Sequence, residues 1–231
     1  TGFITLLVLF LFNQLGEGYA VVLPRLADTL IGCVLAVGAV LVILPDWQSR
    51  RLHKVMSDAI DANKQYLDQI IGQYRIGKKD NLSYRIARRQ AHNSDASLSS
   101  AISTMLAEPG KYRAAVDESF RFLTLNHAML NYISALGAHR TRIEDESIHK
   151  LVLDAHRCIH QHLDVLHKQL HQHCEECDLS NIDDAGLEQR LNEWRDEDDS
   201  SARMVLQQLH LIYRMLPELH SLASKFAVRV N

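Results

Sequence analysis

The 231-residue sequence lacks the short motifs that mark common catalytic sites. It has no glycine-rich phosphate-binding loop, no GxSxG nucleophile motif and no HExxH zinc motif. It also lacks a basic excess, since 25 Lys and Arg residues stand against 28 Asp and Glu residues. A nucleic-acid-binding domain is expected to carry a positive surplus. We therefore predict a protein that is not an enzyme, has no catalytic residues and no cofactor, and binds no nucleic acid.

Cysteine is also scarce, with four residues that do not form a disulfide framework and fit a reducing compartment better. Two of them, Cys174 and Cys177, follow His167 and His171 and share residue types with zinc ligands. Ten residues of helix would separate the ends of this group by about 15 Å, however, which is too far for one tetrahedral site. Two or three of them could bind a metal only if the helix ended near Cys174. We expect no metal site.

Charged residues are nearly absent from residues 1–45, which contain only Glu17, Arg25 and Asp28. The apolar run from Ala27 to Leu44 would reach about 27 Å as a helix, close to the thickness of a bilayer core. A buried helix of a soluble protein could be equally apolar, but an aromatic residue and a basic cluster follow this run, as at a membrane boundary. We predict a transmembrane helix over 26–45, with the C-terminal side in the cytoplasm.

The first residues are apolar too, without a basic region before them or a cleavage pattern after them. We interpret residues 2–13 as the end of a preceding membrane helix, followed by a reversal over 13–24. The chain would then be the C-terminal part of a longer multi-pass protein. Small residues on one side of the 26–45 helix would let another membrane helix approach closely. These helix-packing residues are Gly32, Ala36 and Ala39.

From Asp46 onward, apolar residues recur at three- and four-residue spacing and almost no strand pattern is present. The pattern predicts an all-α protein in two parts: the end of a membrane domain over 1–46, and an antiparallel helical bundle over 47–231. The third bundle helix is apolar almost all round, which predicts that it is the most buried. An acidic loop with a short helix before it would precede the last helix. The expected helices begin near Leu52 and end before Gly77, then cover about 81–107, 111–138, 143–174 and 201–229.

Arg25 and Asp28 are the first candidates for a functional site. They are three residues apart at the non-cytoplasmic end of the predicted span, so one face of a helix could present both. An ionisable residue at that position can bind substrate or carry protons. The alternative is an interfacial arginine that extends to the lipid headgroups and an aspartate close to the start of a helix.

A row of histidines in the predicted 143–174 helix is the second candidate. Their spacing is seven, four, seven and four, which places them within about 60° of one another on a helix, beside its apolar face. Such a stripe could meet a partner helix and respond to pH, because histidine titrates near neutrality. The alternative is that histidine is merely tolerated at a half-exposed boundary. The members of this stripe are His149, His156, His160, His167 and His171.

With these residues in view, the sequence resembles the C-terminal part of the YccS/YhfK-type integral inner-membrane proteins of Gram-negative bacteria. These belong to the fusaric acid resistance (FUSC) superfamily, which includes aromatic carboxylic acid efflux proteins. Arg25, Asp28 and Gly32 fall on the R-x-x-D-T-x-x-G signature of that superfamily. The matching segments are RLADTLIGCVLAVGAVLVILPDW (25–47), YRIARRQAHNSDASLSSAISTMLAEPGKYR (84–113) and FRFLTLNHAMLNYISALGAHR (120–140).

The resemblance implies a multi-pass protein of the bacterial inner membrane with a cytoplasmic C-terminal domain. It also implies a transporter that exports aromatic or other organic acids. The expected partners are the lipid bilayer, the remaining transmembrane helices of the full-length protein, and a second copy of the chain in a homo-oligomer. The alternative is a membrane-tethered helical module for interaction or sensing, in which the membrane segment only anchors the bundle.

Overall fold

The chain divides into two compact units, Thr1–Asp46 and Trp47–Asn231, and each is described by itself. All of the regular structure in the described residues is helical, which confirms the all-α class. The computed structural model describes residues 3, 7, 10, 18–43, 48–77, 81–105, 116–139, 143–172, 182, 186–193 and 200–228.

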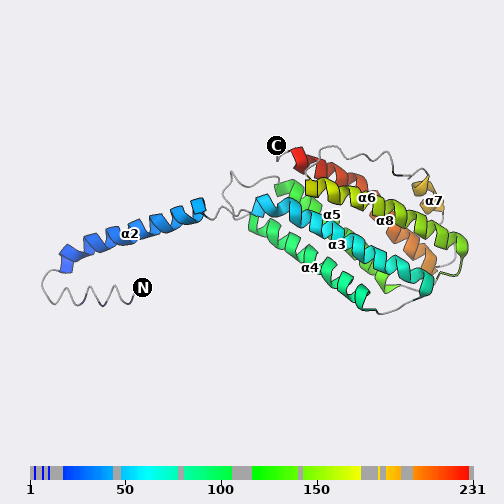
Figure 1. The fold of residues 1–231 in the computed structure, drawn as a ribbon, viewed down its shortest axis with the longest axis horizontal. Helices are drawn as coiled ribbons and strands as arrows, with labels where there is room; N and C mark the ends of the chain where they lie inside the picture. Colours follow the sequence, from blue (N-terminus) through cyan, green and yellow to red (C-terminus); the bar gives the residue numbers. More distant parts are fainter. Residues whose placement is uncertain are drawn as a thin grey trace. The chain divides into compact units, whose positions relative to one another are not determined.

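The first unit contains the helix α2, Gly18–Ile43 (Figure 1). It begins earlier than predicted, so the expected reversal over 13–24 is wrong for its last seven residues. Pro24 lies inside the helix, where it removes one backbone hydrogen bond without ending the helix. Of the predicted helix over 2–13, only Phe3, Leu7 and Phe10 belong to the described residues; all three are helical and exposed.

Within the part of the chain that the structure describes, no helix combines the length and the apolar character that crossing a membrane requires. The transmembrane helix over 26–45 therefore stays a prediction. Its last two residues, Leu44 and Pro45, lie outside the described residues.

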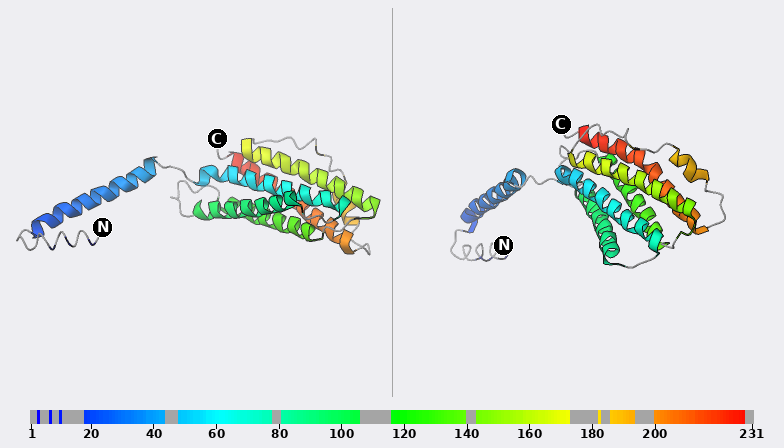
Figure 2. Two further views of the ribbon diagram at one scale, coloured as in Figure 1. Left: turned by 60° about the horizontal axis from the view of Figure 1, so that its bottom comes forward. Right: turned by 45° about the vertical axis from the view of Figure 1, so that its right-hand side comes forward.

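The second unit contains five long helices and one short helix (Figures 1 and 2). Their bounds agree with the predicted ranges to within a few residues wherever both ends are described. The helices are α3 Gln48–Ile76, α4 Leu82–Met105, α5 Val116–Ala138, α6 Glu146–Gln172, α7 Leu187–Glu193 and α8 Ser200–Val228.

Local sequence explains where several of these helices begin and end. Gly77 ends α3 with a φ of 82°, and its N–H donates to the Gln73 carbonyl at 2.7 Å. Asn81 caps α4, since its side chain accepts a 2.8 Å hydrogen bond from the Tyr84 N–H. Asp145 caps α6 by accepting hydrogen bonds from the Ser147 hydroxyl and from backbone N–H groups, which lower its pKa.

The helix directions differ in one respect from the predicted antiparallel bundle. α6 and α8 run in the same direction, because His162 of α6 contacts His220 of α8 and Gln169, further along α6, contacts Ser224, further along α8. A parallel pair needs a connection that returns along the whole length of a helix. The 27 residues between Gln172 and Ser200, which include α7, are long enough for this, because α6 spans only about 40 Å.

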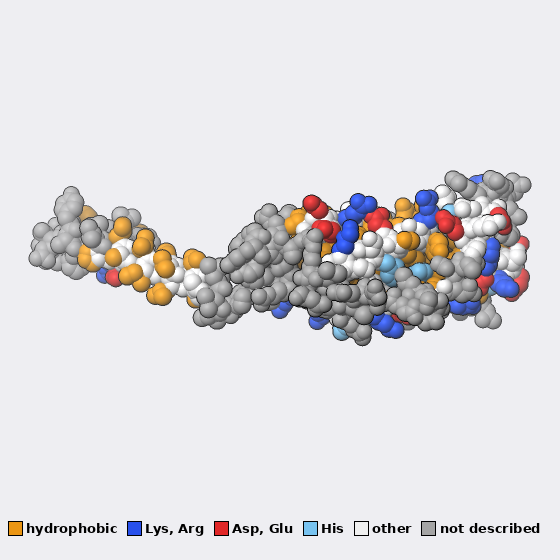
Figure 3. Space-filling model, turned by 90° about the horizontal axis from the view of Figure 1, so that it is seen from above, with side chains coloured by type: hydrophobic (Ala, Val, Ile, Leu, Met, Phe, Trp, Pro, Cys, Tyr) orange, Lys and Arg blue, Asp and Glu red, His pale blue; other side chains and the backbone are white. Residues whose placement is uncertain are grey.

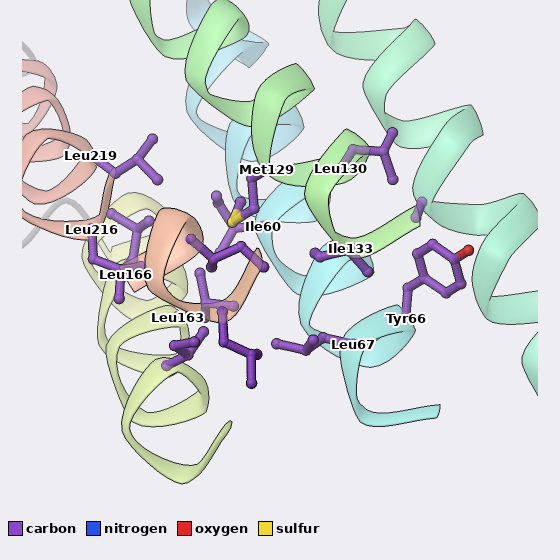
Figure 4. Close-up of a cluster of buried hydrophobic side chains, with 14 of the residues drawn as sticks. Ile60, Tyr66, Leu67, Met129, Leu130, Ile133, Leu163, Leu166, Leu216 and Leu219 are labelled. Carbon is purple, nitrogen blue, oxygen red and sulfur yellow. The ribbon is translucent and has the colours of Figure 1, made fainter. Parts of the chain in front are cut away.

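The core lies where α3, α5, α6 and α8 meet. Figure 4 shows apolar side chains from these four helices in one cluster, among them Ile60, Met129, Leu163 and Leu216, all fully buried. α3 is the central helix, since it packs against α4, α5 and α6. The prediction that the 111–138 helix is the most buried is wrong. Phe120 of α5 is 39% exposed, whereas α3 buries residues such as Met56, Ile60 and Leu67 completely.

Candidate functional site

The first candidate, Arg25 with Asp28, lies on α2, and both side chains are exposed. Among the described residues, neither side chain forms an ion pair, so the guanidinium and the carboxylate are both available to a ligand. The Thr29 hydroxyl donates a 2.8 Å hydrogen bond to the Arg25 carbonyl, one helical turn earlier. This bond occupies the hydroxyl and leaves the two charged groups as the polar features of the helix.

The apolar side chains of α2 are exposed as well. Leu26, Leu30 and Leu35 retain 64–68% of their surface. Gly32, Ala36 and Ala39 also lie at the surface, and no atom stands within 4 Å of the place where a Cβ on Gly32 would be. This open position leaves room for a partner helix, and the helix-packing role of the three small residues stays a prediction.

The second candidate, the histidine stripe, lies on α6, and three of its members reach α3. His156 Nε2 is 2.7 Å from Asp68 Oδ1, and His160 Nε2 is 3.4 Å from Asp68 Oδ2. His160 Nδ1 is also 3.5 Å from Asp164 Oδ2, one turn along α6. One carboxylate of α3 therefore faces two imidazoles of α6.

Lys64 of α3 extends this cluster. Its ammonium lies 2.6 Å from Asp164 Oδ1 and 3.1 Å from Asp61 Oδ1, with the lysine side chain 15% exposed. Burial by itself lowers the pKa of Lys64. The hydrogen bonds that the ammonium donates to the two carboxylates outweigh burial and raise the pKa above its ordinary value. Burial raises the pKa of Asp164, but the hydrogen bond and the charge of Lys64 lower it by more. The pKa therefore lies below its ordinary value, and the carboxyl stays ionised.

The stripe is only partly brought into this interface. His167 Nδ1 lies 2.9 Å from the Ser57 hydroxyl, which joins a second point of α6 to α3. His171 is exposed, with its ring 5.9 Å from that of His167. His149 is half-buried, and its Nδ1 has no hydrogen-bond partner among the described residues. The stripe therefore contacts α3 in its middle and not at its first and last members.

The opposite side of α6 carries a histidine pair that the sequence reasoning missed. His162 Nδ1 lies 3.3 Å from His220 Nε2 of α8, and both side chains are buried. Gln169 and Ser224 continue this polar contact through a 2.8 Å hydrogen bond. Burial, and secondarily the charge of His162, lower the pKa of His220 from 6.5 to about 4. His162 falls outside the seven-four spacing, so no pattern in the sequence indicated it.

The two sides of α6 have opposite electrostatic character. Protonated imidazoles beside Asp68 would form charged pairs, whereas a proton on His220 would place an uncompensated charge in a buried contact. No group of three metal-ligating side chains in the described ranges could hold a metal ion, and Cys174 and Cys177 lie outside those ranges.

The surfaces of the two units differ in composition (Figure 3). In the visible face of the helical unit, acidic, basic and histidine side chains are interspersed with apolar ones. The described part of the first unit shows mainly apolar side chains between a few charged ones. On this face the helical unit thus shows mixed charged and apolar side chains, whereas the described part of α2 shows mainly apolar ones.

Comparison with known proteins agrees with this combination. The chain is 46% identical over 219 residues to "Inner membrane protein YccS" of Escherichia coli, a match that covers 95% of this chain and 30% of YccS. It is also 46% identical over 146 residues to an "Uncharacterized protein" of Haemophilus influenzae, over 63% of this chain and 20% of that protein. "Uncharacterized protein YhfK" of Escherichia coli is 30% identical over 122 residues, 52% of this chain and 16% of YhfK.

The chain belongs to the YccS/YhfK type of membrane proteins, as three segments of its sequence predicted. It spans about 30% of the length of YccS and smaller shares of the other two relatives. No protein-family model matches the chain. No solved structure matches it either.

Proposed function

We propose that this chain is the C-terminal part of a multi-pass inner-membrane efflux transporter for aromatic or other organic acids. α2 would cross the membrane within residues 26–45, and the helical unit, residues 47–231, would lie in the cytoplasm. The observation that carries the proposal is α2 itself. Its apolar side chains are exposed on a chain that is 46% identical to an inner-membrane protein, and its Arg25 and Asp28 form no ion pair with the residues that the structure describes.

The exposure of α2 supports a lipid environment. Leu30 and Val34, one turn apart, are 64% and 63% exposed. Leu26 and Leu35 are 68% and 67% exposed. A row of large apolar side chains in water would be costly, at about 1.5–3 kcal/mol for each side chain left unburied. Lipid chains and neighbouring membrane helices would remove that cost. The basic cluster after residue 47 supports a cytoplasmic position for the helical unit.

Arg25 is the residue that we assign to substrate recognition. A guanidinium holds a carboxylate through two parallel hydrogen bonds, which a lysine ammonium does not reproduce. Asp28, three residues further, would orient the guanidinium when the site is empty or carry a proton. The proposal extends the likeness to the FUSC superfamily, whose R-x-x-D-T-x-x-G signature includes both residues.

The test is export of a radiolabelled aromatic acid from cells that express the full-length protein. We expect Arg25→Lys to lower export at least tenfold and Asp28→Asn to lower it several-fold, with normal amounts of each protein in the membrane. Arg25→Lys keeps the charge, so an arginine that only anchors the helix at the headgroups would tolerate it. The matched control is Arg157→Lys, the same change at an exposed position of α6.

Full export by Arg25→Lys at normal abundance would show that Arg25 is an interfacial anchor. A loss of export in Arg157→Lys equal to that in Arg25→Lys would show that the assay reports general damage. Loss of the variant protein from the membrane would assign Arg25 to insertion or folding. Each of these results contradicts the assignment of Arg25 to substrate.

A second candidate function is a membrane-tethered sensing module. The observation that favours it is the interface between α3 and α6, where Asp68 faces His156 and His160. Histidine side chains that face a carboxylate across a helix interface are a known basis of pH-dependent switches. Cells that lack the full-length protein would then export aromatic acids normally, which separates this candidate from transport.

A further inference from the structure

A cavity between α7 and α8 belongs to neither candidate site. Its volume is about 360 Å³, within the range of small-molecule sites, which begins at about 300 Å³. The cavity exists because the chain returns after α6 and places α7 against the outer side of α8. It is lined by Glu188, Leu191 and Asn192 of α7 and by Arg203, Leu206, Gln207, His210, Leu211 and Arg214 of α8.

The floor of this cavity is apolar. Leu191 and Leu206 are 4% and 2% exposed, so their side chains are fixed in the core and form a rigid wall. A salt bridge holds α7 in place, with Arg190 Nη2 2.8 Å from Asp154 Oδ2 of α6. An apolar group that enters would meet a preformed surface and would not have to open the bundle.

The rim of the cavity is cationic. Arg203 and Arg214 are both exposed, and neither has an ion-pair partner in the described ranges of the chain. Three other arginines of the unit are paired: Arg121 binds Glu218, and both Arg157 and Arg190 bind Asp154. Two unpaired guanidinium groups at one cavity are suited to an acid group, which each can hold through two hydrogen bonds.

His210 lies between the two arginines on the same side of α8. Its Nε2 atom is buried without a hydrogen-bond partner in the described residues, although the side chain as a whole is 17% exposed. The nearest carboxylate oxygen, Oε1 of Glu188, is 3.8 Å away, which is too long for a hydrogen bond. A buried ring nitrogen without a partner costs free energy, and a ligand that bonds to it would recover that cost.

From these three features we infer that the α7–α8 cavity binds a small organic anion that carries one acid group on an apolar body. The body packs on Leu191 and Leu206, the acid group binds Arg203 or Arg214 at the rim, and His210 donates or accepts one hydrogen bond. Among the described residues of the lining, Glu188 is the acidic one, and its exposed side chain turns to solvent when the anion enters. The site lies wholly in the second unit, so it is independent of the proposed transport.

The test is fluorine NMR of 4-(trifluoromethyl)benzoate added to the full chain in detergent. We expect saturable line broadening, reversed by cyclohexanecarboxylate, an acid with a different apolar body. The neutral 4-(trifluoromethyl)benzamide should bind at least tenfold more weakly, and inorganic phosphate, which has no apolar body, should not compete. Arg203→Gln with Arg214→Gln should weaken binding of the benzoate at least tenfold.

The matched control is Arg85→Gln with Arg89→Gln, which removes two exposed arginines of α4 that also lack ion pairs in the described residues. It should bind like the parent. Gln207→Trp, a substitution at an exposed position of the lining, should fill the cavity and abolish binding while both arginines remain.

Three results would overturn the inference. Equal broadening by the benzamide would indicate partition into the detergent or an apolar site. Competition by phosphate would indicate a simple anion site. Unchanged binding in Gln207→Trp or in the Arg203 and Arg214 variant would place the ligand elsewhere on the protein. Export measurements do not enter this test, so its failure is distinguishable from failure of the proposed transport.

Discussion

The two sides of α6 place the same residue type in opposite environments. Toward α3, His156 and His160 are 21% and 33% exposed and share the carboxylate of Asp68. Toward α8, His162 and His220 are buried against each other, with His162 Nδ1 3.3 Å from His220 Nε2. Acidification should weaken the contact of α6 with α8, because burial lowers the pKa of His220 and disfavours its charged form.

The difference shows that the response of a histidine to pH depends on what lies across the helix interface. His160 and His162 are only two residues apart on α6, yet His160 faces carboxylates and His162 faces another histidine. Burial without a carboxylate favours the neutral imidazole, whereas a neighbouring carboxylate favours the charged one. One helix thus carries two histidine groups whose effects on stability oppose each other.

The largest effect should come from a permanent charge on the buried side. We expect His220→Lys to lower the free energy of unfolding by about 3 kcal/mol at pH 7.5, because the ammonium would be buried without a partner. Urea unfolding of the full chain in detergent, followed by circular dichroism, measures this. The control is His160→Lys, which adds the same group beside Asp68 and Asp164 and should change stability by less than about 0.5 kcal/mol. Equal losses of stability in the two variants would show that the two sides of α6 tolerate a permanent positive charge equally.

A smaller effect should follow from acidification of the parent. His220 has a pKa of about 4 in the folded chain and an ordinary value of 6.5, so the unfolded state binds the proton more tightly. Its contribution to stability is complete above pH 6.5 and is lost as the pH falls toward 4. Between pH 7.5 and pH 5 the loss should be about 2 kcal/mol.

The same urea titrations at the two pH values test this loss, and His220→Gln, which stays neutral, should remove most of it. If His220→Gln loses as much stability on acidification as the parent does, the loss comes from groups other than His220.

The smallest effect should come from the α3 side. Asp68→Asn keeps a hydrogen-bonding group but removes the charge that faces His156 and His160. We expect it to cost about 1 kcal/mol at pH 5.5 and a few tenths of a kcal/mol at pH 8, because a carboxylate stabilises a histidine more when the ring carries a proton. Asp58→Asn, at an exposed position of the same helix, is the control and should be neutral at both values. If Asp68→Asn costs the same at both pH values, the stripe is ordinary boundary surface.

Much of the fold follows from local sequence, and the candidate sites follow only in part. The positions of the helices and the break at Gly77 were predicted, because periodicity and a glycine with positive φ are local properties. The sequence predicted that the stripe forms a row on one helix, but it did not predict that Asp68 lies opposite that row. A carboxylate 88 residues away from His156 leaves no trace in the spacing of the histidines.

The helix directions illustrate the same limit. Short breaks predicted antiparallel neighbours, and this holds for α3 with α4 and for α3 with α6, where Ser57 contacts His167 and Asp68 contacts His156. It fails for α6 and α8, because a connection of 27 residues can return the chain to its starting end. Periodicity describes each helix by itself and contains no information on the path between helices.

The sequence by itself determined that the protein is helical, that an apolar segment with Arg25 and Asp28 precedes the amphipathic helices, and that the protein resembles a type of membrane protein. These conclusions depend on residues close together in the chain. Only the tertiary structure decided that α8 runs parallel to α6, that His162 meets His220, and that α7 leaves a cavity rimmed by unpaired arginines. Those features depend on which side chains face each other across helix interfaces, and such neighbours are set by the packing of the whole unit.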